Sequence, residues 1–201
     1  MTSLTPLTAL GGTAPYDEII GGIRIVEIAD TCLASLAMRR GKAAAFRNAA
    51  RQALGTGLPA PGQRTGTDER GVIWMGPDQY LVEVETDGAQ TGGAQTGGAQ
   101  TDGADLVDAL GIAFSTAASI TDQSDAFVRF NITGKDVPAM LERLCAADTR
   151  QMLGGAAVRT PIHHMLCVLV CRDAYTGFSV YGPRSAAQSL HHALTAAAVS
   201  L

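Results

Sequence analysis

Three soft side chains lie four residues apart near the C-terminal end: His163, Cys167 and Cys171. On a helix this spacing would put them on one face, where imidazole and thiolate groups bind zinc. The residues between them, Leu166 and 168–170, favour a strand instead. Four residues of strand span about 13 Å, which is too far for neighbouring ligands of one ion. The sequence therefore predicts a strand and no metal site here.

Asp122, Ser124 and Asp125 form a second polar cluster, between two predicted strands. Paired carboxylates in different environments can act as general acid and base. Short Asp and Ser side chains between strands also form turns in which they bond the backbone, and we favour that interpretation. His191 and His192 lie on a predicted helix, where neighbouring side chains point about 100° apart, so we expect one to pack and one to face solvent. We predict no catalytic residue.

The segment Gly55–Ala60 matches the spacing of the dinucleotide-binding fingerprint. That fingerprint needs a strand before it and a helix N-terminus behind it to meet a pyrophosphate. Here the segment follows a predicted helix instead of a strand, and Pro59 and Pro61 stand where the next helix would begin. We therefore interpret the segment as the end of a helix. The sequence holds no phosphate-binding loop, His-Glu-x-x-His or Gly-x-Ser-x-Gly motif, and we predict no cofactor on this chain.

Composition excludes several classes of protein. The 201 residues are 46% hydrophobic and 17% charged with a net charge of −4, which is typical of a globular chain without the basic excess that nucleic acid requires. The longest apolar run, Met165–Cys171, is far shorter than the roughly 20 residues that span a bilayer. Four sparse cysteines and a first stretch without Lys or Arg before Arg24 favour a cytoplasmic protein without disulfides or a targeting peptide.

The first half of the chain predicts the order β-α-β-β-α-β. Gly76–Gln79 is expected to be a type I turn between two short strands, with Pro77 at its first central position. A five-residue repeat, GAQTG, fills most of a predicted flexible loop at 87–104. The predicted elements are strand 33–38, helix 42–54, strands 72–75 and 80–85, helix 105–110 closed by Gly111, and strand 118–121.

The second half predicts β-α-β-β-α. In strand 127–132, apolar residues alternate with Arg129 and Asn131, so we expect only one face to be buried. The remaining elements are a helix from Asp136 to Cys145, a hairpin of strands 165–172 and 178–181, and a last helix capped by Ser185.

Two similar successions of elements indicate an α+β protein built from two ferredoxin-like β-α-β-β-α halves with antiparallel sheets. We divide the chain into an extended N-terminal segment at 1–22, a first half at 23–121 and a second half at 122–201. Residues 23–28 are expected to add a further strand to the first half.

Several segments resemble a known family. The stretch 121–136, with its strand, Gly134 and acidic helix start, is similar to the aminomethyltransferase-like group. Three further segments narrow the resemblance to the gamma subunits of heterotetrameric sarcosine oxidases: Arg40-Gly41 before an Ala-rich helix, the hairpin 74–81, and 181–186 before the last helix. The resemblance runs from about Ile23 to the C-terminus and skips the repeat.

This resemblance implies a non-catalytic subunit with alpha, beta and delta subunits as partners. In that family the alpha and beta subunits hold FAD, FMN, NAD and tetrahydrofolate, the delta subunit holds zinc, and the complex demethylates sarcosine or a related N-methyl amino acid. We predict Trp74, Gly76, Pro77 and Arg184 as interface residues, and an exposed apolar strand or hairpin face for the partners to cover.

Two alternatives remain open at this point. The first is a stand-alone folate-binding protein of the same superfamily, although the Lys-Gly-Cys-Tyr-x-Gly-Gln motif of its iron–sulfur assembly type is absent. The second is an independent hydrolase or transferase that uses Asp122 and His163.

Overall fold

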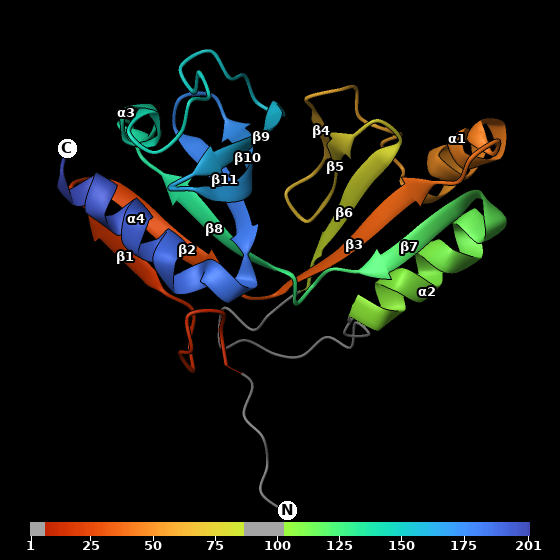
Figure 1. Cartoon of the computed structure of the whole chain (residues 1–201), viewed down its shortest axis with the longest axis horizontal. Coiled ribbons are helices and arrows are strands. Elements are labelled where there is room, and N and C mark those ends of the chain that lie inside the picture. The colour runs from red at the N-terminus through yellow and green to blue at the C-terminus, as the bar shows by residue number, and fades with distance from the viewer. Residues whose placement is uncertain (1–6, 87–102) are drawn as a thin grey trace, which may run out of the picture. The chain divides into compact units, whose positions relative to one another are not determined.

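The computed structural model describes residues 7–86 and 103–201. The chain divides into two compact units, one formed by the residues up to Ala29 together with Asp125–Leu201, and the other by Asp30–Ser124. Each unit is an antiparallel sheet with helices packed on one face (Figure 1). The α+β class with two antiparallel sheets is therefore confirmed.

The unit Asp30–Ser124 holds five strands in the order β4-β5-β6-β3-β7. The first three are β4 (Arg64–Gly66), β5 (Arg70–Gly76) and β6 (Gln79–Glu85), and the other two are β3 (Thr31–Met38) and β7 (Ala118–Asp122). Two helices, α1 (Ala43–Ala53) and α2 (Gly103–Phe114), and the short 3-10 helix η1 (Ser115–Ala117) complete the unit.

The core of this unit lies between one face of the sheet and the two helices. Alternate residues of β3, Ala34 and Leu36, point to this face and are fully buried. The ring of Phe46 on α1 lies 5.2 Å from the ring of Phe114 on α2, measured between centroids. Each large apolar side chain that is removed from water in this way contributes about 1.5–3 kcal/mol.

Three features of this unit differ from the sequence analysis. Helix α2 continues past Gly111 to Phe114, because Leu110 and Phe114 lie one turn apart and are both buried in the core. Of the predicted loop 87–104, residues 87–102 lie outside the described residues and Gly103 already begins α2. Strand β4 was not predicted, since its three residues show no apolar alternation.

The other unit holds six strands in the order β1-β2-β8-β11-β10-β9. They are β1 (Asp17–Ile20), β2 (Ile23–Ile28), β8 (Phe127–Thr133), β11 (Gly177–Pro183), β10 (Met165–Asp173) and β9 (Ala157–Ile162). Helix α3 (Val137–Glu142), the 3-10 helix η2 (Arg184–Ala186) and helix α4 (Ala187–Val199) are its helical elements.

The core of the six-stranded unit is again the helix-covered face. Phe130 and Val180, on neighbouring strands β8 and β11, pack with Leu190 and Leu194 of α4, and all four are fully buried. Leu190 also lies against the backbone at Gly182: a Cβ there would lie 2.4 Å from Leu190 Cδ2, so a side chain at this position would force Leu190 to move.

The division into 23–121 and 122–201 differs from the units of the structure. Strand 23–28 belongs to the six-stranded sheet, where Ile25 pairs with Ile132 of β8, because its apolar residues complete the core of that unit. The N-terminal segment at 1–22 is not simply extended either. Its residues 17–20 form β1 and pair with β2.

Other local predictions also change. The helix expected to run to Cys145 ends at Glu142, and neither Asp136 nor the residue before α4 makes a capping hydrogen bond through its side chain. Ser185 lies inside η2, so it does not cap α4. Arg129 was expected to face solvent and is instead buried, for reasons given below. Within residues 7–86 and 103–201, no helix has the length and apolarity to cross a lipid bilayer.

Candidate functional site

Trp74, Gly76 and Pro77 lie together at one end of the β5–β6 hairpin. Trp74 is half-buried opposite Tyr80, and Pro77 is exposed at the tip. Asp78, the second central residue of the turn, has φ 59°, whereas a type I turn requires a negative φ there. The turn is therefore one whose second central residue has a left-handed conformation. Type II turns have this geometry and commonly have Pro as the first central residue. The type I prediction was wrong.

Arg184 lies in the six-stranded unit, at the start of η2. Its Nη2 donates a hydrogen bond to the carbonyl oxygen of Leu7 at 3.2 Å, and its Nε lies 4.0 Å from Asp125 Oδ1. The side chain keeps 35% of its surface exposed. Arg184 thus holds the N-terminal segment and still presents part of its guanidinium to solvent. The structure brings the three hairpin residues together and places Arg184 in the other unit.

Asp122 and Ser124 form the turn that the sequence analysis favoured. Asp122 Oδ1 accepts hydrogen bonds from the hydroxyl and the backbone nitrogen of Ser124, at 2.7 and 2.9 Å. These bonds lower the pKa of the Asp122 carboxyl below its usual value. The Ser124 hydroxyl also accepts a bond from Leu33 N at 3.1 Å, which joins the turn to β3. The carboxylate is therefore engaged in local structure, and its lowered pKa is opposite to that of a general acid.

His163, Cys167 and Cys171 do not meet. Cys167 and Cys171 lie on β10 with buried side chains, and His163 lies in the two-residue turn before the strand. Burial raises the pKa of Cys167 to about 11 and also raises that of Cys171. Thiols in such surroundings are poor nucleophiles. The described residues contain no group of three His, Cys, Asp or Glu side chains placed to hold a metal ion.

His191 packs and His192 is exposed, as the helical spacing predicted. The His191 ring meets the edge of Tyr16, with centroids 4.2 Å apart, and lies 6.0 Å from Phe130. Burial lowers the pKa of His191, opposed in part by the negative charges of Glu18 and Glu27. The ring thus serves as a packing surface for the N-terminal segment.

A polar cluster that sequence reasoning missed occupies the helix-free face of the six-stranded sheet. Asn131 Oδ1 accepts hydrogen bonds from Ser179 Oγ at 2.6 Å and from Arg129 Nε at 3.2 Å. Arg172 donates to Ser179 Oγ at 2.8 Å and also to the hydroxyl of Tyr181. These bonds join the central strands β8, β11 and β10.

The Arg129 guanidinium lies over the Tyr181 ring, 5.6 Å from its centroid, which adds a cation–π contact. This contact and the bond to Asn131 explain why Arg129 is buried. The strand register aligns Arg129 with Tyr181 and Asn131 with Ser179. The alternation of residues along β8 and β11 therefore places these polar side chains on one face of each strand, but only the pairing of the strands shows that they meet.

Comparison with known proteins gives a likeness in fold. No known protein family's profile matches the chain, and no curated protein matches it in sequence. A chain of the heterotetrameric sarcosine oxidase from Corynebacterium sp. U-96, solved with pyrrole 2-carboxylate, superposes with a TM-score of 0.71 at 23% identity, over 89% of this chain and 84% of that one.

A second solved structure, the regulatory subunit of aspartate kinase from Thermus thermophilus, gives a TM-score of 0.41 at 17% identity over 89% of this chain. The first likeness establishes that this chain shares its fold with a chain of heterotetrameric sarcosine oxidase.

Proposed function

We propose that this chain is the non-catalytic gamma subunit of a heterotetrameric sarcosine oxidase, or of a related oxidative demethylase of N-methyl amino acids. The observation that carries the proposal is the fold likeness to a chain of such an enzyme, which extends over 89% of this chain and 84% of the other. A likeness over most of both chains matches a whole subunit, whereas a shared domain embedded in a longer enzyme would leave much of one chain unmatched.

The chemistry of the described residues supports a structural role. Asp122 is bonded within a turn, the thiols of Cys167 and Cys171 are buried with raised pKa values, and His191 packs against Tyr16. These four side chains, which the sequence offered for catalysis or metal binding, are thus engaged in packing or in local hydrogen bonds.

In this proposal the alpha and beta subunits hold FAD, FMN, NAD and tetrahydrofolate, the delta subunit holds zinc, and the reaction takes place on those chains in the cytoplasm. This chain supplies surface that stabilises the assembly. Trp74, Gly76, Pro77 and Arg184 remain our proposed contacts, since part of Arg184 and the tip of the hairpin are accessible.

The test is co-expression of the alpha, beta and delta subunits of the complex with and without this chain. We expect the four chains to purify together as a yellow complex, and the three chains alone to assemble less stably while retaining flavin. A complex that forms equally well without this chain would contradict the proposal. If the purified single chain instead binds tetrahydrofolate, the stand-alone folate-binding function replaces it.

A further inference from the structure

Positive charge is concentrated in one segment of the chain. Residues 31–67 contain six of the 15 Lys and Arg residues, whereas all 19 Asp and Glu residues lie elsewhere. One of the six, Arg64, is buried and forms an ion pair with Glu83 at 2.5 Å. The other five are exposed, and we name them the α1 basic patch: Arg39, Arg40, Lys42, Arg47 and Arg51.

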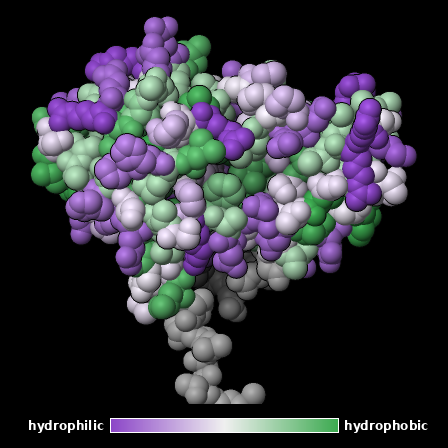
Figure 2. Space-filling model, viewed as in Figure 1, coloured by the Kyte–Doolittle hydropathy of each residue, from purple (hydrophilic) through white to green (hydrophobic). Residues whose placement is uncertain are grey.

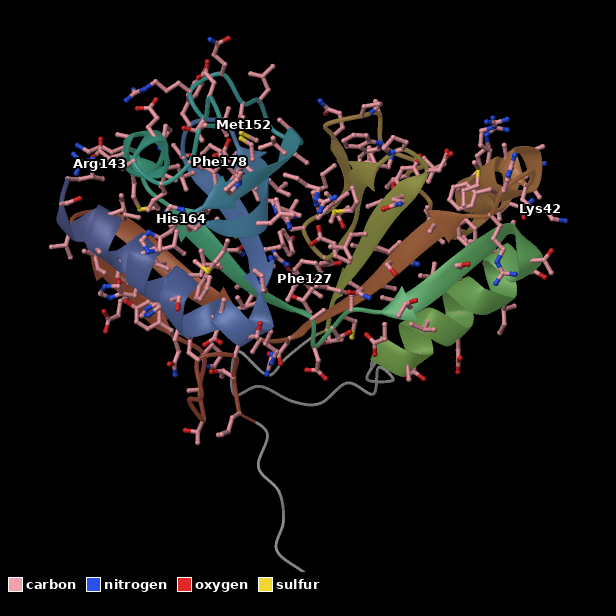
Figure 3. All side chains as sticks on the ribbon, in the orientation of Figure 1. Lys42, Phe127, Arg143, Met152, His164 and Phe178 are labelled. Carbon is pink, nitrogen blue, oxygen red and sulfur yellow. The ribbon has the colours of Figure 1, made fainter. Side chains whose placement is uncertain are left out.

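The five residues lie on one stretch of chain, in the turn before α1 and on the helix itself. Lys42 N donates to Arg39 O at 3.1 Å, which closes a tight turn, and Gly41 in that turn has φ 77°, a conformation that favours glycine. Three cations are therefore held in four residues directly before α1. Arg47 and Arg51 follow on the helix one turn apart, on the same exposed face. Figure 3 shows Lys42 beside α1, at the margin of its unit.

Only Arg51, in the last turn of α1, is favoured by the helix dipole, and the other four cations add little stability to the unit. The first turn of α1 carries no acidic residue, and cations near a helix N-terminus are disfavoured by the helix dipole. Arg39 bonds Ser119 Oγ at 3.1 Å, and no described carboxylate forms an ion pair with any of the five cations. Like charges at one turn's separation also repel each other.

The exposed face of α1 carries no large apolar side chain beside the cations. Ala44, Ala45 and Asn48 are exposed there beside Arg47 and Arg51. Figure 2 shows hydrophilic side chains gathered over the region of α1. Small side chains allow the surface of another protein to approach the helix closely, and the arginines then reach carboxylates at its rim.

We infer that the α1 basic patch is a docking surface for an acidic face of another protein chain. The inference rests on the proposed function, which makes that chain one of the flavin-bearing subunits. Complementary charge steers association and fixes orientation, more than it adds affinity. Nucleic acid fits less well, because the whole chain has a net charge of −4 and therefore lacks the basic excess that a phosphate backbone requires.

The test measures how fast the purified chain binds an immobilised complex of the alpha, beta and delta subunits. The variant R47E/R51E reverses two exposed cations of the patch, and the control R70E/K135E makes the same change of net charge at exposed positions outside it. We expect the patch variant to associate about tenfold more slowly than the wild type at low salt, and the control about as fast as the wild type. We also expect raising NaCl from about 50 to about 500 mM to slow the wild type strongly and the patch variant little.

The outcomes separate the two claims. If the wild type binds and the patch variant associates equally fast, the docking surface is overturned and the proposed function stands. If the wild type does not bind the complex at all, both fall. Circular dichroism of each variant shows whether α1 is intact, and a second reversal, R40E/K42E, repeats the test outside the helix. If the chain binds a DNA duplex at physiological salt and R47E/R51E abolishes it, the partner is nucleic acid and the inference is wrong.

Discussion

The carboxylate of Glu27 accepts a hydrogen bond from the backbone nitrogen of Tyr16 at 3.2 Å. Its other oxygen accepts one from Leu10 N at 3.1 Å, and the side chain is only 2% exposed. The Tyr16 carbonyl in turn accepts a bond from Glu27 N at 2.8 Å. A buried acid on β2 thus holds a segment that has too few apolar residues to pack by itself.

Replacing Glu27 by Ala should release this segment. Hydrogen bonds to a charged acceptor contribute about 1.5–3 kcal/mol each, so we expect the loss of two to lower the free energy of unfolding by about 3 kcal/mol or more. Hydrogen exchange should show faster exchange at Leu10 and Tyr16, with β10 and β11 unchanged. E18A is the control, because the exposed Glu18 bonds only the Tyr16 hydroxyl. Equal effects of both variants would contradict the anchoring role.

The turn between β9 and β10 should be open to stabilisation. His163 and His164 both have positive φ, 46° and 70°, between the paired residues Ile162 and Met165. This is the geometry of a type I′ turn, which favours Asn-Gly, and positive φ costs other residues about 1–2 kcal/mol each. We expect H163N/H164G to raise the melting temperature by about 2–4 °C. The matched variant H163A/H164A removes both rings without relieving φ and should give no gain.

Asp122 should contribute stability that depends on pH. Its folded-state pKa lies below the ordinary value of 3.8, because Ser124 bonds the charged form. The contribution is therefore complete above the unfolded pKa and disappears as the pH falls through the folded one. Urea midpoints of wild type and D122N should differ at neutral pH and converge as the pH falls below 3.8. D125N, which removes a carboxylate that is 99% exposed, is the control for the loss of one negative charge.

The thiols should react slowly in the native protein. Because the pKa of Cys167 is about 11, only about a thousandth of this thiol is in the thiolate form at pH 8. Cys145 is half-buried with a raised pKa, and we expect it to react with a disulfide reagent before Cys167 and Cys171. Denaturant should expose all the thiols at once. Fast native labelling of Cys167 would mean that β10 opens readily.

The sequence was informative wherever apolar alternation or helical spacing was strong. The strands at 33–38, 80–85 and 127–132 were predicted within two residues of their observed ends, and the turn of Asp122 and Ser124 followed from the habits of those residues. The strand predicted at 165–172 was also correct, since β10 spans Met165–Asp173.

What failed depends on contacts between distant segments. Nothing within 23–28 shows which sheet the strand joins; its pairing with β8, more than 100 residues away, decides that. The cluster around Asn131 needs three strands in register before Arg129, Ser179 and Arg172 meet. The turn at Pro77-Asp78 depends on a single backbone angle, which composition does not determine.

The most direct test of the proposed subunit role is native mass spectrometry of the tagged chain purified from its own cells. We expect one copy of this chain in a complex with three other chains, with the flavin absorbance of the whole. A colourless species at the mass of the single chain, 20.8 kDa, would contradict the proposal.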